Sequence, residues 1–495
     1  MMKTYLIDRE GIRRIQEKIP WNGKTLINDL GLKPIIDTMA SGDSFLLNNS
    51  VKYLLNGTQS IAEISYRQNI LKDFINNSEI AYSIYENASA FIEEGKKQFF
   101  WFSNNDSLSI NVSIDIITTF SKYMEKIRKI LLENSNKFES EGLKKFSSVV
   151  TEEFGKEYMD QVMENLEMLQ FKDGVTMSVT IGPGNEGRDY IICMPDIRAG
   201  GLKKLVNSTL EKHYTYILPD RDIAGGEEIS DIRKRGLGNI SMVLKKTSEN
   251  IMAFFKLMQS EIGFYLAAIN LIKKIRERNG NITFPVPERD NRKLSFDGLY
   301  DLGLFLGTNN QVISNNLDGN DIDLFIITGT NRGGKSTFIR SIGQAQLMMQ
   351  AGLFVPANQF ICSVFSGVYT HFKHEEDETL ERGNFDEELR SMNEIAGHIS
   401  KGSIMIFNES FSATNTREGS DIAMQITSAL IENGIRVFFV SHLYEFASSM
   451  EEQKKYDSIF MVAERKADGT HTYKIIKGEP SSTGYGMDLY HRIFD

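Results

Sequence analysis

The sequence has little cysteine, little proline and no long apolar run. Its 495 residues include only two cysteines, Cys193 and Cys362, and nine prolines. Two cysteines are too few for a disulfide framework, which predicts a reducing, cytoplasmic setting with both thiols acting as small buried hydrophobic groups. The N-terminus lacks the apolar stretch of a signal peptide, and no other stretch is apolar for long enough to span a bilayer. We therefore expect no membrane association.

Basic residues are in the minority. Lys and Arg number 56 against 66 Asp and Glu, and the net charge of −10 gives no broad electrostatic attraction to nucleic acid. A local basic surface remains compatible with this sum. Arg233-Lys234-Arg235 and Lys273–Arg278 are the candidates for contact with a phosphate backbone, although charge runs of this length on helices are usually solvated surface.

Helical spacing of apolar residues dominates the first half of the chain. Apolar positions three or four apart predict one long helix from Leu143 to Leu169, and steps of four and three predict a second from about Val243 to Arg278. Between them, alternation over about residues 175–193 predicts a β-hairpin. We expect a mainly α-helical domain over residues 1–285 that carries this hairpin. A rigid arm with a tip and an ordinary helical bundle are both compatible with the periodicity.

Beyond residue 285 the pattern changes to alternating strands and helices. Buried strands are expected at Leu324–Ile327, Ser403–Phe407 and Val437–Val440, with helices between them. This order predicts a three-layer α/β domain over residues 286–495. Ligands of such domains bind at the carboxyl ends of the strands, where we expect the functional residues.

A glycine-rich loop follows the first of these strands. It consists of Gly329, Thr330, Asn331, Arg332, Gly333, Gly334, Lys335, Ser336 and Thr337. Strand, glycine loop, Lys-Ser and helix, in this order, are typical of a phosphate-binding loop. Glycines let backbone N–H groups approach an anion, Lys335 would reach the β- and γ-phosphates, and the Ser336 hydroxyl would ligate Mg²⁺. The loop predicts binding of a nucleotide with Mg²⁺.

Polar residues end the two other predicted strands. Asn408 and Glu409 follow the second strand as in a Walker B element, and Glu409 fits a carboxylate that orients or deprotonates the attacking water. Asn408 occupies the place where an Asp usually helps to hold the metal. His442 follows the third strand and would hydrogen-bond the γ-phosphate or the water. The structural alternative is that Asn408 and Glu409 only cap the strand end, and a lone histidine after a strand, such as His442, is usually structural as well.

Taken in order, these segments resemble the MutS family of DNA mismatch-repair ATPases. The resemblance rests on Thr328–Thr337, Arg340, Gly352–Ala357, Glu409–Gly419, Ser441–Glu445 and Ser482–Gly486, and it covers about residues 320 to 490. It implies an ATPase domain of the ABC and MutS type with ATP and Mg²⁺ as cofactors. It also implies a homodimer through these domains and a role on DNA in repair or recombination. Arg67-Gln68 and the two long helices are compatible with the family's core and lever domain.

Several positions depart from the family pattern. Mismatch-reading members carry a wedge domain and a connector domain, and the roughly 320 residues before the loop leave no room for both, so we expect a short member without them. Gly383 and Asn384 replace the Ser and Thr of the STF segment that faces the partner's nucleotide, and Asn408 replaces the Walker B Asp. The leading hypothesis is an ATP hydrolase that rearranges a dimer and its lever arms. The alternative is a nucleotide-gated binding or scaffold protein with little ATP turnover.

Overall fold

The protein divides into two compact units. The computed structural model describes residues 2–11, 18–100, 106–170, 176–185, 187–193, 223–289, 292–373, 384–466 and 470–480. The helical unit comprises Met1–Thr4, Tyr82–Asn136 and Lys145–Gln259, and the sheet unit comprises Tyr5–Ala81, Lys137–Lys144 and Ser260–Asp495. Among the described residues, no helix combines the length and apolar character needed to cross a bilayer.

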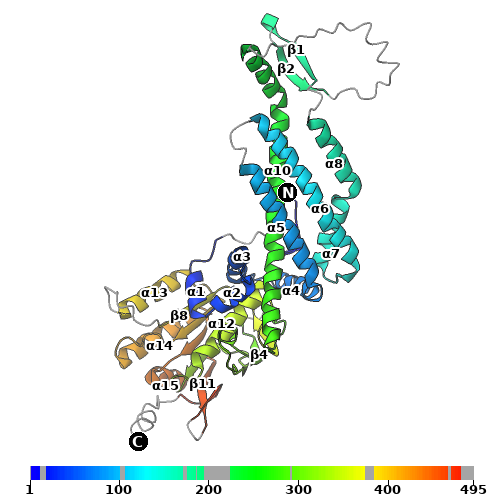
Figure 1. Ribbon diagram of the computed structural model, residues 1–495. Helices are drawn as coiled ribbons and strands as arrows, with labels where there is room; N and C mark the ends of the chain where they lie inside the picture. Colours follow the sequence, from blue (N-terminus) through cyan, green and yellow to red (C-terminus); the bar gives the residue numbers. More distant parts are fainter. Residues whose placement is uncertain are drawn as a thin grey trace. The chain divides into compact units, whose positions relative to one another are not determined.

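Long helices with an aromatic core build the helical unit. They are α5 (Ser78–Phe100), α6 (Asp106–Asn134), α7 (Glu141–Ser148), α8 (Lys156–Leu169) and α10 (Ile223–Glu277), with short turns at Ser135–Lys137 and Val149–Glu153. Helices α6 and α8 lie wholly in this unit, whereas α5, α7 and α10 also extend into the sheet unit. Phe255 of α10 packs on Phe91 of α5 and Phe120 of α6, with ring centroids 4.0 and 5.9 Å apart. Helices α5 and α6 therefore lie alongside α10 (Figure 1).

Two helix predictions need correction. The single helix expected over residues 143–169 is interrupted by a π turn at Val149–Glu153 and by Gly155, whose extended backbone starts α8. The helix expected from Val243 begins instead at Ile223. Glycines in its first turns, such as Gly225 and Gly226, interrupt the apolar period there, so the periodicity hid that part of the helix.

The alternating stretch between these helices forms a hairpin. Strands β1 (Met177–Ile181) and β2 (Gly187–Ile192) pair antiparallel, and a short turn at Pro183–Asn185 connects them. Gly184 adopts a φ of +78° in this turn, a conformation that glycine reaches without steric cost.

Four helices stand at the start of the sheet unit. They are α1 (Gly23–Asp29), α2 (Lys33–Ala40), α3 (Ser44–Leu55) and α4 (Ile61–Asn76). The first three come from a stretch without a clear apolar period, whereas Ile64, Leu71 and Ile75 are at helical spacing and predict a helix from Ile61. Asp43 caps α3 by accepting from the N–H groups of Phe45 and Leu46, and Ser60 caps α4. Local capping thus sets the start of α3, in a stretch where apolar spacing predicted no helix.

A six-stranded sheet forms the centre of the sheet unit. Its order is β12-β11-β6-β10-β9-β8, with β6 (Leu324–Thr328), β8 (Val368–Phe372), β9 (Ile404–Asn408), β10 (Arg436–Val440), β11 (Ser458–Arg465) and β12 (His471–Lys477). Every pair is parallel except β11 with β12. Val440 pairs with Ile327 and with Asn408, so the carboxyl ends of β6, β9 and β10 lie at one edge.

A second sheet extends the prediction from the sequence. It has the order β3-β7-β4-β5, with β3 (Val286–Glu288), β4 (Leu294–Leu299), β5 (Asn315–Asp318) and β7 (Gln359–Ser363). Of the strands in these two sheets, only β6, β9 and β10 were predicted from the sequence. These three strands are buried on both faces and give continuous apolar runs, whereas the other strands carry more polar or half-exposed positions.

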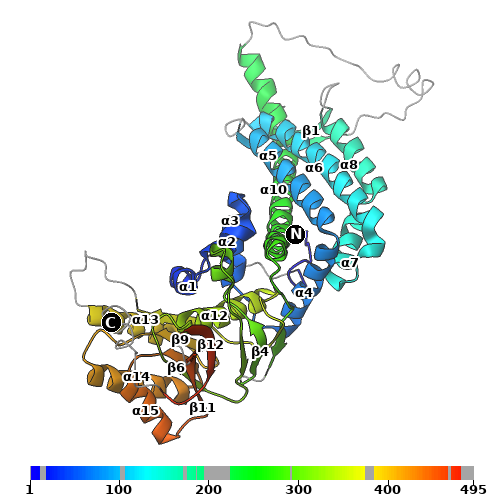
Figure 2. The same ribbon diagram turned by 60° about the horizontal axis from the view of Figure 1, so that its bottom comes forward.

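Helices cover both faces of the six-stranded sheet. Figure 2 shows α12 (Lys335–Ala351) on one side, and α14 (Thr416–Glu432) and α15 (Tyr444–Gln453) on the other. Alternate strand residues, Leu324, Ile326, Met405, Phe407, Val437 and Phe439, share a core with α14, α15 and α13 (Asn384–His398). The unit is therefore a helix–sheet–helix sandwich, with the short helix α11 (Leu302–Gly307) beside α12.

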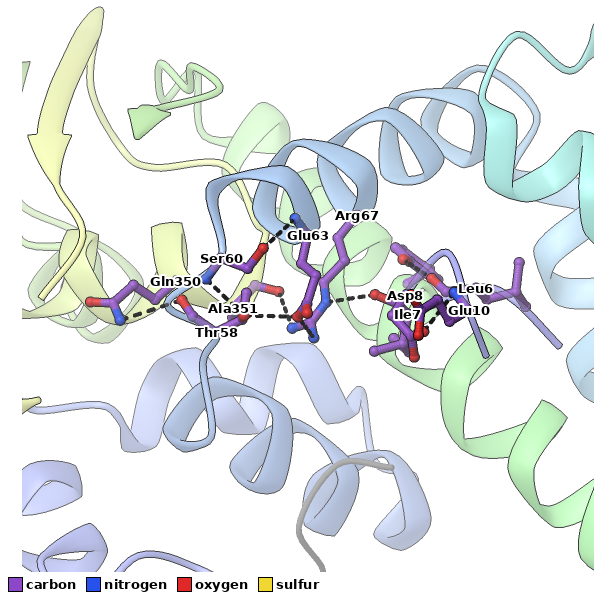
Figure 3. A network of polar contacts seen from close by, with 11 residues as sticks. Leu6, Ile7, Asp8, Glu10, Thr58, Ser60, Glu63, Arg67, Gln350 and Ala351 are labelled. Carbon is purple, nitrogen blue, oxygen red and sulfur yellow. Dashed lines mark hydrogen bonds and ion pairs between the residues drawn. The ribbon is translucent and has the colours of Figure 1, made fainter. Parts of the chain in front are cut away.

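The far end of α12 is held by a buried arginine (Figure 3). Arg67 of α4 is 1% exposed, and its guanidinium donates to the carbonyl oxygens of Ile7 at 3.1 Å and Ala351 at 3.3 Å. Glu63 lies one turn earlier, with its carboxylate 3.7 Å from the guanidinium. Ala351 ends α12, and the last carbonyls of a helix have no partner within it. Arg67 thus ties α12, α4 and the N-terminal segment together.

Candidate functional site

The glycine loop joins β6 to α12 through backbone conformations that glycine favours. Gly329 has a φ of +110° and Gly334, at the start of α12, a φ of +95°. The neighbouring strand β11 also approaches closely, since a Cβ on Gly333 would lie 2.6 Å from the Cβ of Ala463. Side chains at these positions would block the loop or strain it. Asn331 and Arg332 are exposed at the turn, and Thr330 is buried with its hydroxyl 3.3 Å from Nδ1 of His471.

Lys335 lies folded against this loop. Its ammonium donates to the carbonyl oxygens of Gly329 at 3.0 Å and Thr330 at 2.9 Å, and the residue is 4% exposed. Burial lowers the pKa of Lys335, and the nearby Glu409 carboxylate partly opposes this shift. The loop therefore holds a desolvated cation at the start of α12, where the helix dipole also favours an anion.

Ser336 and Asn408 meet across the edge of the sheet. The Ser336 hydroxyl donates to the side-chain oxygen of Asn408 at 2.8 Å. Both side chains offer hard oxygen atoms, the ligand type that Mg²⁺ prefers, and Mg²⁺ sites commonly take few protein ligands beside phosphate and water. In the parts of the chain that the structure describes, no cluster of three or more His, Cys, Asp or Glu could hold a metal alone. The pair fits a partial Mg²⁺ site that a bound phosphate would complete.

Glu409 and His442 form the second polar pair at this edge. Nε2 of His442 lies 2.9 Å from Oε1 of Glu409, and because a carboxylate only accepts, the imidazole donates. This hydrogen bond is the main cause that lowers the pKa of Glu409, against the opposing effect of burial. The sequence placed His442 on the γ-phosphate or the water. In the structure its imidazole contacts the Glu409 carboxylate, and Glu409 lines the pocket beside the loop.

Lys335, Ser336 and Glu409 line one pocket of about 380 Å³, whereas Asn408 and His442 contact Ser336 and Glu409 without lining it. Among the candidates it is lined by Arg332, Gly333, Gly334, Lys335, Ser336, Thr337 and Glu409. The remaining lining was not predicted from the sequence and consists of Leu304, Asn310, Gln311, Val312, Ile313, Asn315 and Tyr473. These residues come from α11, the loop after it, β5 and β12, and no spacing in the sequence links them to the glycine loop.

The pocket has a polar and an apolar part. Lys335, Ser336 and Glu409 supply charge and hydrogen-bonding groups, while Leu304, Val312 and Ile313 present apolar side chains. Such a division suits a ligand that has a charged group at one end and a flat, less polar group at the other.

Other residues predicted from the sequence lie elsewhere. Arg340 donates to the carbonyl oxygen of Asp29, and Gly352 ends α12 with a φ of +87°. Gly383 and the segment Ser482–Gly486 lie outside the described residues, and Asn384 is described only as the first residue of α13. Of the two basic clusters, the side chains of 233–235 lie outside the described ones, and Lys273 and Lys274 are exposed on α10.

Two family models match the chain. The MutS2 N-terminal domain matches residues 59–278, and MutS domain V matches residues 325–493, a range that contains every candidate residue of the pocket edge. The chain belongs to the MutS family. The predicted resemblance is thereby confirmed, and the first match extends it over much of the helical part.

Individual relatives agree with this assignment. The DNA mismatch repair protein MutS of Thermotoga petrophila is 27% identical over 271 residues, 54% of this MutS-family chain and 33% of the relative. That of Thermotoga neapolitana is 32% identical over 170 residues, covering 34% of this chain and 21% of the relative. The MutS protein homolog him-14 of Caenorhabditis elegans is 25% identical over 164 residues, covering 33% and 20%. The chain thus spans about a third or less of the length of these relatives.

Proposed function

We propose that this MutS-family protein binds ATP with Mg²⁺ in the pocket beside the glycine loop and hydrolyses it. The observation that carries the proposal is the convergence of Lys335, the Ser336–Asn408 pair and the Glu409–His442 pair at one edge of the sheet. Phosphoryl transfer to water requires a cation that binds the phosphates, oxygen ligands that hold the metal, and an ionised carboxylate that activates the water.

The phosphates would lie on the loop and the base in the apolar part of the pocket. Lys335 would exchange its bonds to the Gly329 and Thr330 carbonyls for bonds to phosphate oxygens. The exchange is favourable because a buried ammonium gains more from an anion than from two neutral carbonyls. Val312 and Tyr473 would contact the base, the flat end of the ligand.

Ser336 and Asn408 would hold Mg²⁺, which neutralises charge on the phosphates when bound. Glu409 would accept a hydrogen bond from the attacking water and take up its proton. His442 orients the Glu409 carboxylate and favours its ionised form through the bond at 2.9 Å. The roles fall on three neighbouring strand ends: Lys335 and Ser336 follow β6, Asn408 and Glu409 lie at the end of β9, and His442 follows β10.

At the level of the whole protein, we propose a homodimer joined through ATPase domains at residues 286–495, with lever motion driven by ATP. The printed names of the relatives concern DNA mismatch repair, and we extend a role on DNA, in repair or recombination, to this chain on that basis. A second candidate is a nucleotide-gated scaffold with little turnover. It is favoured by Asn408, because a neutral amide holds a metal less strongly than a carboxylate.

Two variants test the proposal. Lys335→Ala removes the cation assigned to the phosphates and is expected to abolish ATP binding, measured with a fluorescent ATP analogue. Glu409→Gln keeps binding and slows steady-state hydrolysis by a factor on the order of 10²–10⁴, the usual contribution of a positioned acid or base. Glu445→Gln, an exposed change on α15 outside the pocket, serves as the matched control.

The same measurements separate the two candidates. Hydrolysis that Glu409→Gln suppresses and Glu445→Gln leaves intact supports the ATPase. Tight ATP binding without measurable turnover in the unaltered protein, with or without DNA, supports the scaffold. Size-exclusion chromatography with ATP present tests the proposed dimer. Glu409→Gln is expected to accumulate an ATP-bound dimer, and a monomer under these conditions contradicts that part of the proposal.

A further inference from the structure

The loop that carries Glu409 has an unusual backbone. Glu409 has a φ of +58° and Phe411, two residues later, a φ of +63°. Residues with a Cβ avoid this left-handed region because the Cβ crowds the following carbonyl oxygen. Such conformations persist only where surrounding contacts enforce them. The contacts that hold residues 409–412 therefore also determine where the Glu409 carboxylate lies.

Glu388 of α13 supplies a charged anchor for this loop. Its Oε2 accepts a hydrogen bond from the backbone N–H of Phe411 at 2.9 Å. The Phe411 side chain is fully buried in the core beneath the sheet. On the other side, Gly419 makes room for the loop, since a Cβ there would lie 2.3 Å from the carbonyl oxygen of Phe411. Phe411 is thus fixed by a hydrogen bond at its N–H and by close packing of Gly419 against its carbonyl oxygen.

His371 of β8 supplies the second anchor. Its Nδ1 lies 2.7 Å from the Ser410 hydroxyl, which in turn donates to the His371 carbonyl oxygen at 2.6 Å. Nε2 lies 3.0 Å from the carbonyl oxygen of Glu388, which can only accept, so Nε2 donates. The imidazole also stacks on the Phe411 ring, with centroids 5.4 Å apart and planes at 18°. His371 therefore joins β8, α13 and the loop.

We propose that Glu388 and His371 are positioning residues that hold the 409–412 loop so that Glu409 faces the pocket. Neither side chain lines the pocket, so neither would contact a nucleotide bound there. Glu409 itself is held by its N–H to the Val440 carbonyl and by its carboxylate to His442, and the Ser412 hydroxyl donates to its carbonyl at 2.7 Å. Glu388 and His371 hold the two residues between, Ser410 and Phe411. The inference rests on the proposed role of Glu409 and deepens it.

The first test compares Glu388→Ala with Glu387→Ala. Glu387 is the exposed neighbour on the same helix, so the two variants remove the same groups from adjacent positions. Glu388→Ala is expected to lower kcat on the order of 10²-fold, the effect of displacing a catalytic group by about 1 Å, with nucleotide affinity unchanged. Glu388→Gln keeps an oxygen that accepts from Phe411 and is expected to restore most of the rate. Equal kcat values for the two Ala variants would overturn the proposal.

A second variant tests the proposal if the Glu388→Ala protein does not fold. Ser410→Ala removes the bonds to His371 with little change in volume, and it is expected to lower kcat without weakening nucleotide binding. Unchanged turnover in this variant counts against the part assigned to His371. In a Glu409→Gln background, Glu388→Ala is expected to lower kcat no further, because Glu388 acts through Glu409. A further loss of kcat as large as in the unaltered background would contradict an action through Glu409.

Hydrogen exchange tests the anchor without turnover. Glu388→Ala is expected to speed amide exchange in the peptide that covers residues 409–412, and Glu387→Ala is expected to leave it unchanged. Unchanged exchange in Glu388→Ala would show that Glu388 does not hold the loop. If Glu409→Gln hydrolyses ATP at the normal rate, the proposed catalytic role fails, whereas the exchange result still decides whether the loop depends on Glu388.

Discussion

Arg67→Ala is expected to destabilise the sheet unit strongly. The change removes a fully buried guanidinium that donates to the carbonyls of Ile7 and Ala351 and lies beside Glu63. A hydrogen bond from a charged donor contributes about 1.5–3 kcal/mol, and removing one partner of a buried ion pair costs about 3–5 kcal/mol. These contributions overlap, so we expect a total loss of about 3–5 kcal/mol. That is a large part of the roughly 5–15 kcal/mol that stabilises a typical domain.

Urea denaturation measures this loss. Trp21 lies in the sheet unit, where its ring stacks on His398 at 4.4 Å between centroids. With Trp101 replaced by Phe, Trp21 is the only remaining tryptophan and its fluorescence follows the sheet unit. The midpoint and slope of that transition give the change in the free energy of unfolding.

Arg9→Ala is the matched control, since it makes the same chemical change in the same unit. Arg9 pairs with Glu141 at 3.0 Å, but its side chain is 62% exposed, and exposed ion pairs contribute about 0–1 kcal/mol. Arg67→Ala should therefore shift the midpoint several times further than Arg9→Ala. Shifts of equal size would refute the reasoning, because burial would then not decide what the arginine contributes.

Three further predictions concern the site. Asn408→Asp should lower the Mg²⁺ concentration needed for half-maximal hydrolysis, because a carboxylate adds a full negative charge; an unchanged magnesium titration would mean that Asn408 does not serve the metal. ATP affinity should be highest below the lowered pKa of Lys335 and fall as pH rises through it, since phosphates bind the protonated form; a flat profile from about pH 7 to 10 contradicts this. Gly419→Ala should lower stability by about 1–3 kcal/mol through the clash with Phe411, whereas Gly397→Ala, with open space around it, should not lower the melting temperature.

The sequence by itself determined the parts of this protein that are contiguous in the chain. The glycine loop, the apolar strand before it and the helix after it are set by a few neighbouring residues from Leu324 onward, so spacing alone predicts them. The strands that end at Asn408 and Val440 are buried on both faces and give unbroken apolar runs. Parallel pairing then aligns their carboxyl ends, which is why three separate motifs could be expected at one edge.

Only the tertiary structure decided what surrounds these motifs. Tyr473 and Val312 reach the pocket from elements far from the loop in sequence, and Glu388 reaches Phe411 across 23 positions. Each contact depends on how helices and sheet edges pack, and the spacing of apolar residues along the sequence does not show this. The buried charge of Arg67 is a further case, because a sequence shows an arginine but not the two backbone carbonyls that make its burial favourable. The spacing of residues along the chain determines the secondary structure of a segment, whereas long-range packing determines which groups its side chains contact.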